Sequence, residues 1–225
     1  FVPTMGNLHK GHMALIDKAK SYDSHVTASI FINPLQFNDD SDFNNYPKSL
    51  DEDIALLSKH RCDSVFIPDS SILENIKDIK APDTALYLCG RNRPGHFDGV
   101  LTIVNKLFEI TKPTRSFFGK KDFQQLTLIK NFVIENNLPI EIISVDTVRE
   151  LNGLAMSSRN NRLSESDREK ASELYKTLSL IKDNSNNLSK KMIKNHKDGL
   201  IQQGFDVDYL SACDPISLKD LVDLS

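Results

Sequence analysis

Cysteine is scarce in this chain, and long apolar stretches are missing. The three cysteines, Cys62, Cys89 and Cys213, are odd in number and far apart, which argues against a disulfide framework and a zinc site. We interpret them as buried or incidental thiols of a protein in a reducing cytoplasm. No apolar run reaches the length of a membrane span, and no signal-peptide pattern precedes the first strand. The sequence therefore predicts no membrane association.

Charge of one sign is also lacking. The net charge is −3 over 225 residues, so nothing draws the chain as a whole to nucleic acid or to acidic membranes. Repeats and low-complexity segments are absent, and the length suits one large domain or one and a half small ones. Neither a Ser-His-Asp or Cys-His arrangement nor a cluster of carboxylates suited to a metal is apparent.

Short apolar runs alternate with helical periodicity from the start of the chain. This pattern predicts a Rossmann-like α/β fold, a parallel sheet with helices on both faces. Helices are expected from the capping box Ser49–Glu52 toward His60, around residues 100–108, and after Asp122. The predicted strands are the chain start and residues 26–32, 64–67, 85–88, 115–118 and 140–145.

The character of the sequence changes near Val148, so we predict two domains, residues 1–147 and residues 148–225. The second is expected to be a smaller α+β lid, with helices from Ser164 toward Ile181 and from Ser189 to Gly204, and a strand at 206–212. The chain opens inside a strand without an initiator Met and stops without a closing element. We therefore expect it to be a fragment whose lid is incomplete.

The first residues carry the strongest chemical signal. A strand passes through a glycine turn into a helix, with His9 and His12 three positions apart and Gly11 between them. Amides at a helix N-terminus favour phosphate, and both rings lie on one helical face. Met156–Arg159, far downstream, adds hydroxyls and a guanidinium suited to closing over a triphosphate. A plain turn with a helix cap is the alternative; together the two motifs resemble the nucleotidyltransferase superfamily.

Three further polar segments follow predicted strands or precede predicted helices. Asn33 and Gln36 offer amides to an organic substrate, unless they form only an Asn-Pro turn. Residues 90–99 are dense in anion-binding groups, although a structural turn is possible. Lys121 is placed to reach a polyphosphate, and Asp122 to bind ribose or to cap the next helix.

Taken in order, five segments resemble the pantoate–β-alanine ligase family: PTMGNLHKGH, SIFINPLQF, RPGHFDGV, FFGKKDFQQL and TVRELNGLAMSSRN. The likeness extends to about Leu163 and weakens after Ser164. It implies an ATP-dependent ligase of the cytoplasm that joins pantoate to β-alanine through a pantoyl adenylate. It also implies a homodimer, with Mg²⁺ carried on the ATP phosphates.

The resemblance also implies a set of site residues. His12, as a proton donor, His9, Lys121 and Arg159 would be catalytic. Gln36 and Gln125 would bind pantoate, with Gln36 also touching β-alanine and with Asn33, Tyr46 and Arg93 as weaker candidates. Lys120 departs from the acidic residue common at its position, and we expect a small effect. The expected ATP-binding residues are Met5, Gly6, Asn7, Leu8, His9, Lys10, Gly11, His12, Gly119, Lys120, Lys121, Asp122, Val148, Met156, Ser157, Ser158 and Arg159.

Two other functions fit the same residues. Another nucleotidyltransferase would join a nucleotide to a phosphorylated acceptor, and it would call for further basic residues beside Gln36 and Gln125. A nucleotide-binding module without turnover is the second alternative, made plausible by the short second domain. Binding of ATP without pantoate-dependent release of pyrophosphate would favour the module.

Overall fold

The computed structural model describes residues 1–22 and 25–221. The chain divides into two compact units, Phe1–Val148 and Arg149–Ser225. The first unit contains a parallel sheet covered by helices, and the second is mainly helical.

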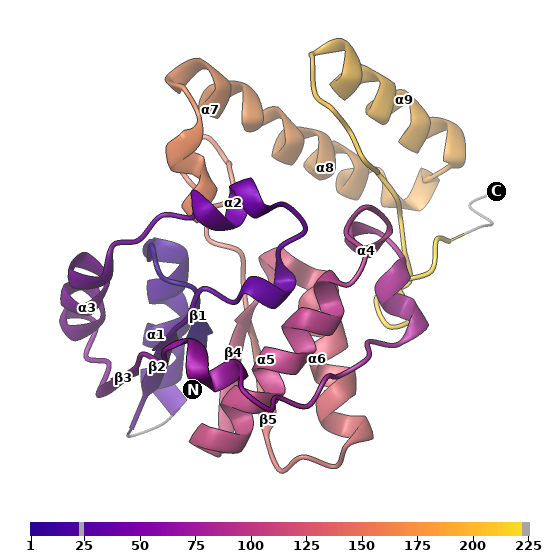
Figure 1. Ribbon diagram of the computed structural model, residues 1–225. Coiled ribbons are helices and arrows are strands. Elements are labelled where there is room, and N and C mark those ends of the chain that lie inside the picture. Colours follow the sequence, from indigo (N-terminus) through magenta and orange to yellow (C-terminus); the bar gives the residue numbers. More distant parts are fainter. Residues whose placement is uncertain (23–24, 222–225) are drawn as a thin grey trace. The chain divides into compact units, whose positions relative to one another are not determined.

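The strands of the first unit form two sets of parallel pairs. One set runs in the order β1-β2-β3, and the other pairs β4 with β5. Two hydrogen bonds join the sets: the Phe1 nitrogen donates to the Arg115 carbonyl at 2.8 Å, and the Phe117 N–H donates to the Phe1 carbonyl at 3.0 Å. This is the bonding of parallel neighbours, so the order across the unit is β3-β2-β1-β4-β5 (Figure 1). The strands are β1 (Val2–Thr4), β2 (Thr27–Ile30), β3 (Ser64–Phe66), β4 (Arg115–Gly119) and β5 (Glu141–Val145).

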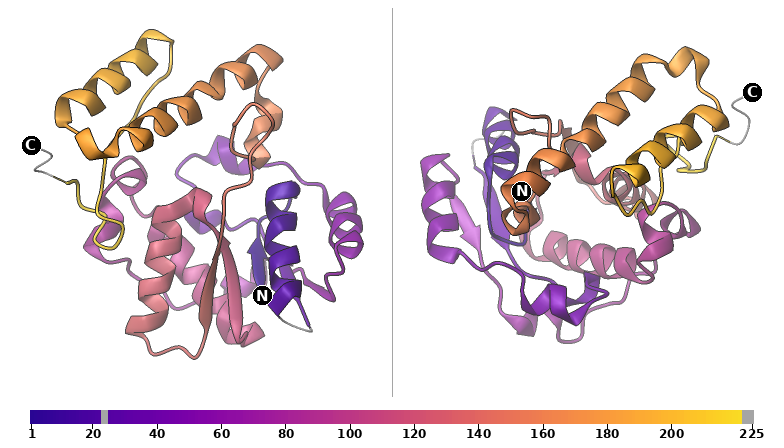
Figure 2. Two further views of the ribbon diagram at one scale, coloured as in Figure 1. Left: turned by 180° about the vertical axis from the view of Figure 1, so that it is seen from behind. Right: turned by 90° about the horizontal axis from the view of Figure 1, so that it is seen from above.

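Helices cover both faces of this sheet (Figure 2), as the sequence predicted. Strand β4 shows why, because Phe117 and Phe118 are consecutive and point to opposite faces. Phe117 joins a core with α1 (Lys10–Tyr22) and Leu57 of α3 (Leu50–Lys59), whereas Phe118 joins a core with α5 (His96–Thr111) and α6 (Phe123–Glu135). The short helices α2 (Asp40–Asn44) and α4 (Cys89–Asn92) lie in the connections.

The second unit consists of α7 (Glu165–Ala171), α8 (Glu173–Asp183) and α9 (Lys190–Gln202). The single helix expected from Ser164 toward Ile181 is divided at Ser172, whose hydroxyl donates to the Glu169 carbonyl at 2.7 Å. Among its described residues, β pairing is limited to the isolated bridges Arg149–Ala155 and Cys213–Asp220.

Two predicted strands were wrong. Residues 85–88 fall in a 3-10 turn, Asp83–Leu86, and in the residues after it. The Gln124 side chain donates to the carbonyls of Thr84 and Tyr87, so these groups are satisfied without a neighbouring strand. Residues 206–212 are irregular, and in the described part of the chain no strand lies beside them to complete a ladder.

Within residues 1–22 and 25–221, no helix is both long enough and apolar enough to cross a membrane. Cys62, Cys89 and Cys213 are half-buried thiols outside any disulfide bond.

Candidate active site

The candidate site lies where the strand order of the first unit reverses. Strands β2 and β3 extend to one side of β1, and β4 and β5 extend to the other. In open parallel sheets, ligands bind beyond the carboxyl ends of the strands at such a point. The segment after β1 carries His9 and His12, and the segment after β4 carries Lys121. Two motifs separated by more than a hundred residues thus meet at one edge of the sheet.

The turn between β1 and α1 has an uncommon backbone. Gly6 and Asn7 both have positive φ, 81° and 49°, a region that glycine occupies freely and asparagine tolerates. The Asp53 carboxylate of α3 accepts hydrogen bonds from the N–H groups of Asn7 (2.8 Å) and Leu8 (2.7 Å). Sequence reasoning missed Asp53. Its signal is the four-residue spacing to Leu57, which places both on the buried face of α3.

The rings of His9 and His12 lie against each other, with centroids 4.1 Å apart and planes tilted by 40°. The His9 backbone N–H donates to Nδ1 of His12 at 3.2 Å, and the Gly11 N–H donates to Nδ1 of His9 at 3.1 Å. A ring nitrogen that accepts a hydrogen bond carries no proton, so in both neutral rings the proton is on Nε2. Each ring therefore presents one N–H donor.

Both rings are uncharged at neutral pH. Burial, followed by the charges of His9 and Lys121, lowers the pKa of His12 to about 3. Burial, followed by the charge of Lys121, also lowers the pKa of His9. Lys121 therefore lies close enough to act on both rings, and the structure brings these three predicted catalytic residues together.

The helix N-terminus differs from our expectation. From the sequence we expected unpaired amides to hold phosphate. Instead, the amides of Asn7 and Leu8 donate to Asp53, and those of His9 and Gly11 donate to the two rings. The Nε2–H groups of the two rings are donors in this turn that can serve phosphate. Because its pKa is about 3, His12 suits hydrogen-bond donation rather than release of an acid proton.

Protein stability should depend on pH through His12. Folded His12 stays neutral to about pH 3, whereas the unfolded residue protonates near its ordinary pKa of about 6.5. Because the unfolded state binds the extra proton, the free energy of unfolding should fall as pH drops through this window, by at most about 1.4 kcal/mol per pH unit for one proton. Urea unfolding between about pH 4.5 and 7.5 gives the free energy of unfolding of the wild type and of His12→Gln at each pH. This free energy should fall more steeply with decreasing pH in the wild type than in the variant. Equal slopes would contradict the assignment.

The turn after β2 holds Gln36 in place. Asn33 is 2% exposed, and its amide nitrogen donates to Gln36 Oε1 and to the Gly99 carbonyl, both at 3.1 Å. Its Oδ1 accepts from the Leu35 N–H at 3.2 Å. A Cβ on Gly99 would lie 2.0 Å from the Leu35 carbonyl oxygen, so only glycine allows α5 to come this close. Both the nitrogen and the oxygen of the Asn33 side-chain amide are therefore hydrogen-bonded, and the bond to Oε1 holds the Gln36 side chain in place.

The other substrate candidates of the first unit surround this turn. His96 Nδ1 donates to the Gln36 carbonyl at 2.7 Å, and the Arg93 guanidinium donates to the same oxygen at 3.3 Å. Sequence reasoning gave His96 no separate role. Tyr46 is 6% exposed, and its ring meets that of Phe37 edge-on at 5.8 Å. Their contact with substrate stays a prediction.

After β4, the two adjacent lysines have different partners. Lys120 pairs with Asp146 at 2.6 Å, and Lys121 lies 3.2 Å from Asp122. Asp122 begins α6 without a capping hydrogen bond from its side chain. Gln125 is half-buried on α6 and stays a candidate ligand, whereas the buried Gln124 is engaged with the backbone around Tyr87.

The Met156–Arg159 motif belongs to the second unit. Ser157 accepts a hydrogen bond from the Arg159 N–H at 3.2 Å and opens the 3-10 helix Ser158–Arg162. The buried Asn160 anchors this segment, because its amide donates to Glu150 at 2.9 Å and to the Ala155 carbonyl at 3.0 Å. The role of this motif in ATP binding stays a prediction, as does that of Val148.

Comparisons with known proteins agree on one family. A family model described as pantoate-beta-alanine ligase matches residues 1–224. Pantothenate synthetases of Leptospira biflexa and Chromohalobacter salexigens are 45% and 44% identical; the alignments cover 100% and 93% of this chain, and 82% and 76% of those proteins.

Solved structures give the same result. The pantothenate synthetase of Thermus thermophilus superposes with a TM-score of 0.92 at 39% identity, covering all of this chain (100%) and 84% of that one. The ligase of Francisella tularensis, complexed with beta-gamma ATP and β-alanine, gives 0.85 at 39% identity, covering 95% and 81%. From its sequence and its fold together, this chain belongs to the pantoate–β-alanine ligase family.

Proposed function

We propose that this chain condenses pantoate with β-alanine at the expense of ATP, through a pantoyl adenylate, and releases pyrophosphate and AMP. The observation that carries the proposal is the convergence of His9, His12 and Lys121 at the switch point of a parallel sheet. The family supports ATP and β-alanine as substrates, since a related ligase is described in complex with beta-gamma ATP and β-alanine.

In the first step, a carboxylate oxygen of pantoate attacks the α-phosphorus of ATP. The bond from that phosphorus to the bridging oxygen breaks, and negative charge develops on the phosphoryl oxygens and on the departing pyrophosphate. The Nε2–H groups of His9 and His12 and the ammonium of Lys121 are preorganised donors for this charge. Pantoate is already ionised, so the step requires no base.

In the second step, the neutral amine of β-alanine attacks the acyl carbon of the adenylate. The bond between that carbon and the phosphate oxygen breaks, AMP departs, and the nitrogen loses a proton. We assign pantoate to Gln36 and Gln125, with Gln36 also touching β-alanine, because the Asn33 bond to Oε1 leaves the Gln36 NH₂ group as donor. That NH₂ lies 3.1 Å from Met5 Sδ, on the turn that leads to the histidines.

Other parts of the proposal rest on family resemblance. Ser157, Ser158 and Arg159 would add donors to the phosphates and limit access of water to the adenylate. Mg²⁺ would be held by the ATP phosphates and would neutralise their charge. Among the described residues, no three His, Cys, Asp or Glu side chains form a metal cluster. A cytoplasmic homodimer completes the proposal.

Omission of one reactant at a time tests the function. With ATP, pantoate and β-alanine present, we expect AMP and pantothenate in equal amounts. With pantoate but no β-alanine, ATP–pyrophosphate exchange should persist, and without pantoate it should stop. Binding of ATP with no pantoate-dependent exchange would instead favour a nucleotide-binding module, and exchange dependent on a phosphorylated acceptor would favour another nucleotidyltransferase.

A further inference from the structure

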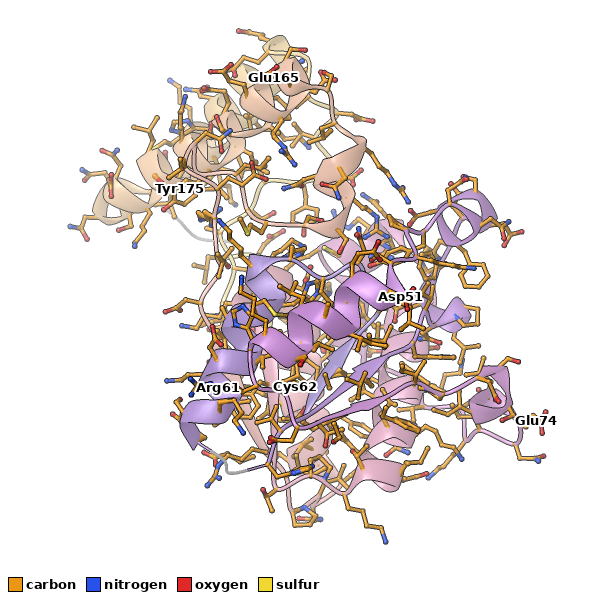
Figure 3. All side chains as sticks on the ribbon, turned by 90° about the vertical axis from the view of Figure 1, so that its left-hand side faces the viewer. Asp51, Arg61, Cys62, Glu74, Glu165 and Tyr175 are labelled. Atoms are coloured by element: carbon orange, nitrogen blue, oxygen red, sulfur yellow. The ribbon has the colours of Figure 1, made fainter. Side chains whose placement is uncertain are left out.

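Asp53 is a buried carboxylate outside the set of predicted ligands. It is 3% exposed, and it lies on α3, whose first turn also carries the exposed Asp51 (Figure 3). We propose that Asp53 is a positioning residue for the adenylation step: its carboxylate fixes the turn after β1 so that His9 and His12 present their Nε2–H groups to the phosphates. This inference rests on the proposed function.

The contacts of Asp53 are suited to this role. Its Oδ2 accepts a hydrogen bond from the Asn7 N–H at 2.8 Å, and its Oδ1 accepts one from the Leu8 N–H at 2.7 Å. Each carboxylate oxygen thus holds one of two consecutive peptide groups. The Ser49 hydroxyl donates to Oδ1 at 3.2 Å. Ser49 directly precedes α3 and forms no side-chain capping bond there, whereas its hydroxyl donates to Asp53. A buried carboxylate is costly unless it is bonded in this way.

The turn fits closely around the carboxylate. A Cβ on Gly6 would crowd Asp53 Oδ2 at 3.0 Å and Ile30 Cγ2 at 3.2 Å, and the φ of 81° independently favours glycine. Asn7 follows with a φ of 49°, a conformation that its bond to Asp53 stabilises.

The two histidines follow directly from the segment that Asp53 holds. Leu8 precedes His9, whose N–H donates to His12 Nδ1, and His9 Nδ1 accepts from Gly11. The direction of the His9 N–H, and with it the tautomer of His12, therefore depends on the peptide planes fixed by Asp53. Asparagine in place of Asp53 would keep the volume but turn an NH₂ group toward one of the two backbone donors.

The test compares Asp53→Asn with Asp51→Asn, which removes the same charge from an exposed position of the same helical turn. We expect Asp53→Asn to slow pantoate-dependent ATP–pyrophosphate exchange by about tenfold to a hundredfold, mainly in kcat, since displaced donors act on the transition state. The reaction of supplied pantoyl adenylate with β-alanine involves no pyrophosphate and should lose much less. Asp51→Asn should behave as the wild type.

Nitrogen–proton correlation spectra of the rings give a readout that a purely structural role would not move. The wild type should show the Nε2–H tautomer for His9 and His12, with signals assigned from His9→Gln and His12→Gln, and Asp53→Asn should show a mixture. A folded Asp53→Asn with wild-type tautomers and full exchange activity would overturn the proposal, as would an equal loss in Asp51→Asn.

A measurement on the wild type covers the case in which Asp53→Asn does not fold. The amides of Asn7 and Leu8 precede the first helical residue, yet their bonds to Asp53 should protect them from exchange with deuterium. Exchange at the rate of an open chain would refute the inference. Failure of the proposed function is distinct, because it would appear as a wild type that lacks pantoate-dependent exchange while these amides and tautomers remain as described.

Discussion

Replacement of His12 by alanine should slow pantoate-dependent ATP–pyrophosphate exchange by about a hundredfold or more, the loss expected when one preorganised donor at a developing charge is removed. The reason is the Nε2–H group, which the bond from the His9 amide to Nδ1 holds in place. The effect should appear in kcat, because the donor acts most strongly on the charge that forms in the transition state.

The His12 prediction has two comparisons. His12→Gln retains an N–H donor and should keep more activity than His12→Ala, since a neutral donor and not a positive charge is required. His25→Ala changes an exposed ring outside the site and should retain full exchange. Near-normal exchange in His12→Ala would remove the basis of the site assignment.

Lys121→Ala should cost about a hundredfold in the same assay while leaving thermal unfolding nearly unchanged. Its ammonium is a charge beside the two rings, and its ion pair with the neighbouring Asp122 lies at the surface, where such pairs contribute little to stability. The lysine also lowers the pKa of both histidines, so without it these pKa values rise and the rings protonate at higher pH. The acid limb of the pH profile should therefore shift upward.

Two further substitutions define the role of this lysine. Lys121→Arg keeps the positive charge and should restore part of the rate and the original acid limb. Lys120→Ala removes an adjacent ammonium that is paired with Asp146, and its effect should be much smaller than that of Lys121→Ala. A large drop in the melting temperature of Lys121→Ala would identify a structural lysine instead.

Local patterns predicted much of the fold and part of the site. Alternation of strands and helices predicted the covered parallel sheet, and the position of each motif after a strand placed His12 and Lys121 at the same edge. Residues 85–88 were mistaken for a strand because a short apolar run does not show which groups bind its carbonyls. Here the Gln124 side chain binds the carbonyls of Thr84 and Tyr87, and no neighbouring strand is needed.

The remaining features depend on partners distant in sequence. The contact between Asp53 and Asn7 spans 46 residues. The spacing of Asp53 to Leu57 places the carboxylate on the buried face of α3, but it does not show which backbone groups the carboxylate binds. The ring tautomers follow from backbone bonds that exist only once this turn is formed. Pairing of β1 with β4 likewise depends on strand order, which the residues of neither strand specify.

The uncharged state of the two rings bears on how the leaving group departs. Two imidazolium rings would form ion pairs with pyrophosphate and retain it after the bond has broken, whereas neutral N–H donors form weaker bonds with it. In the proposed reaction, the fixed direction of these donors would stabilise the charge as it forms. The lack of charge on the rings would then let pyrophosphate dissociate. The low pKa of His12, which follows chiefly from burial, keeps its ring an uncharged donor.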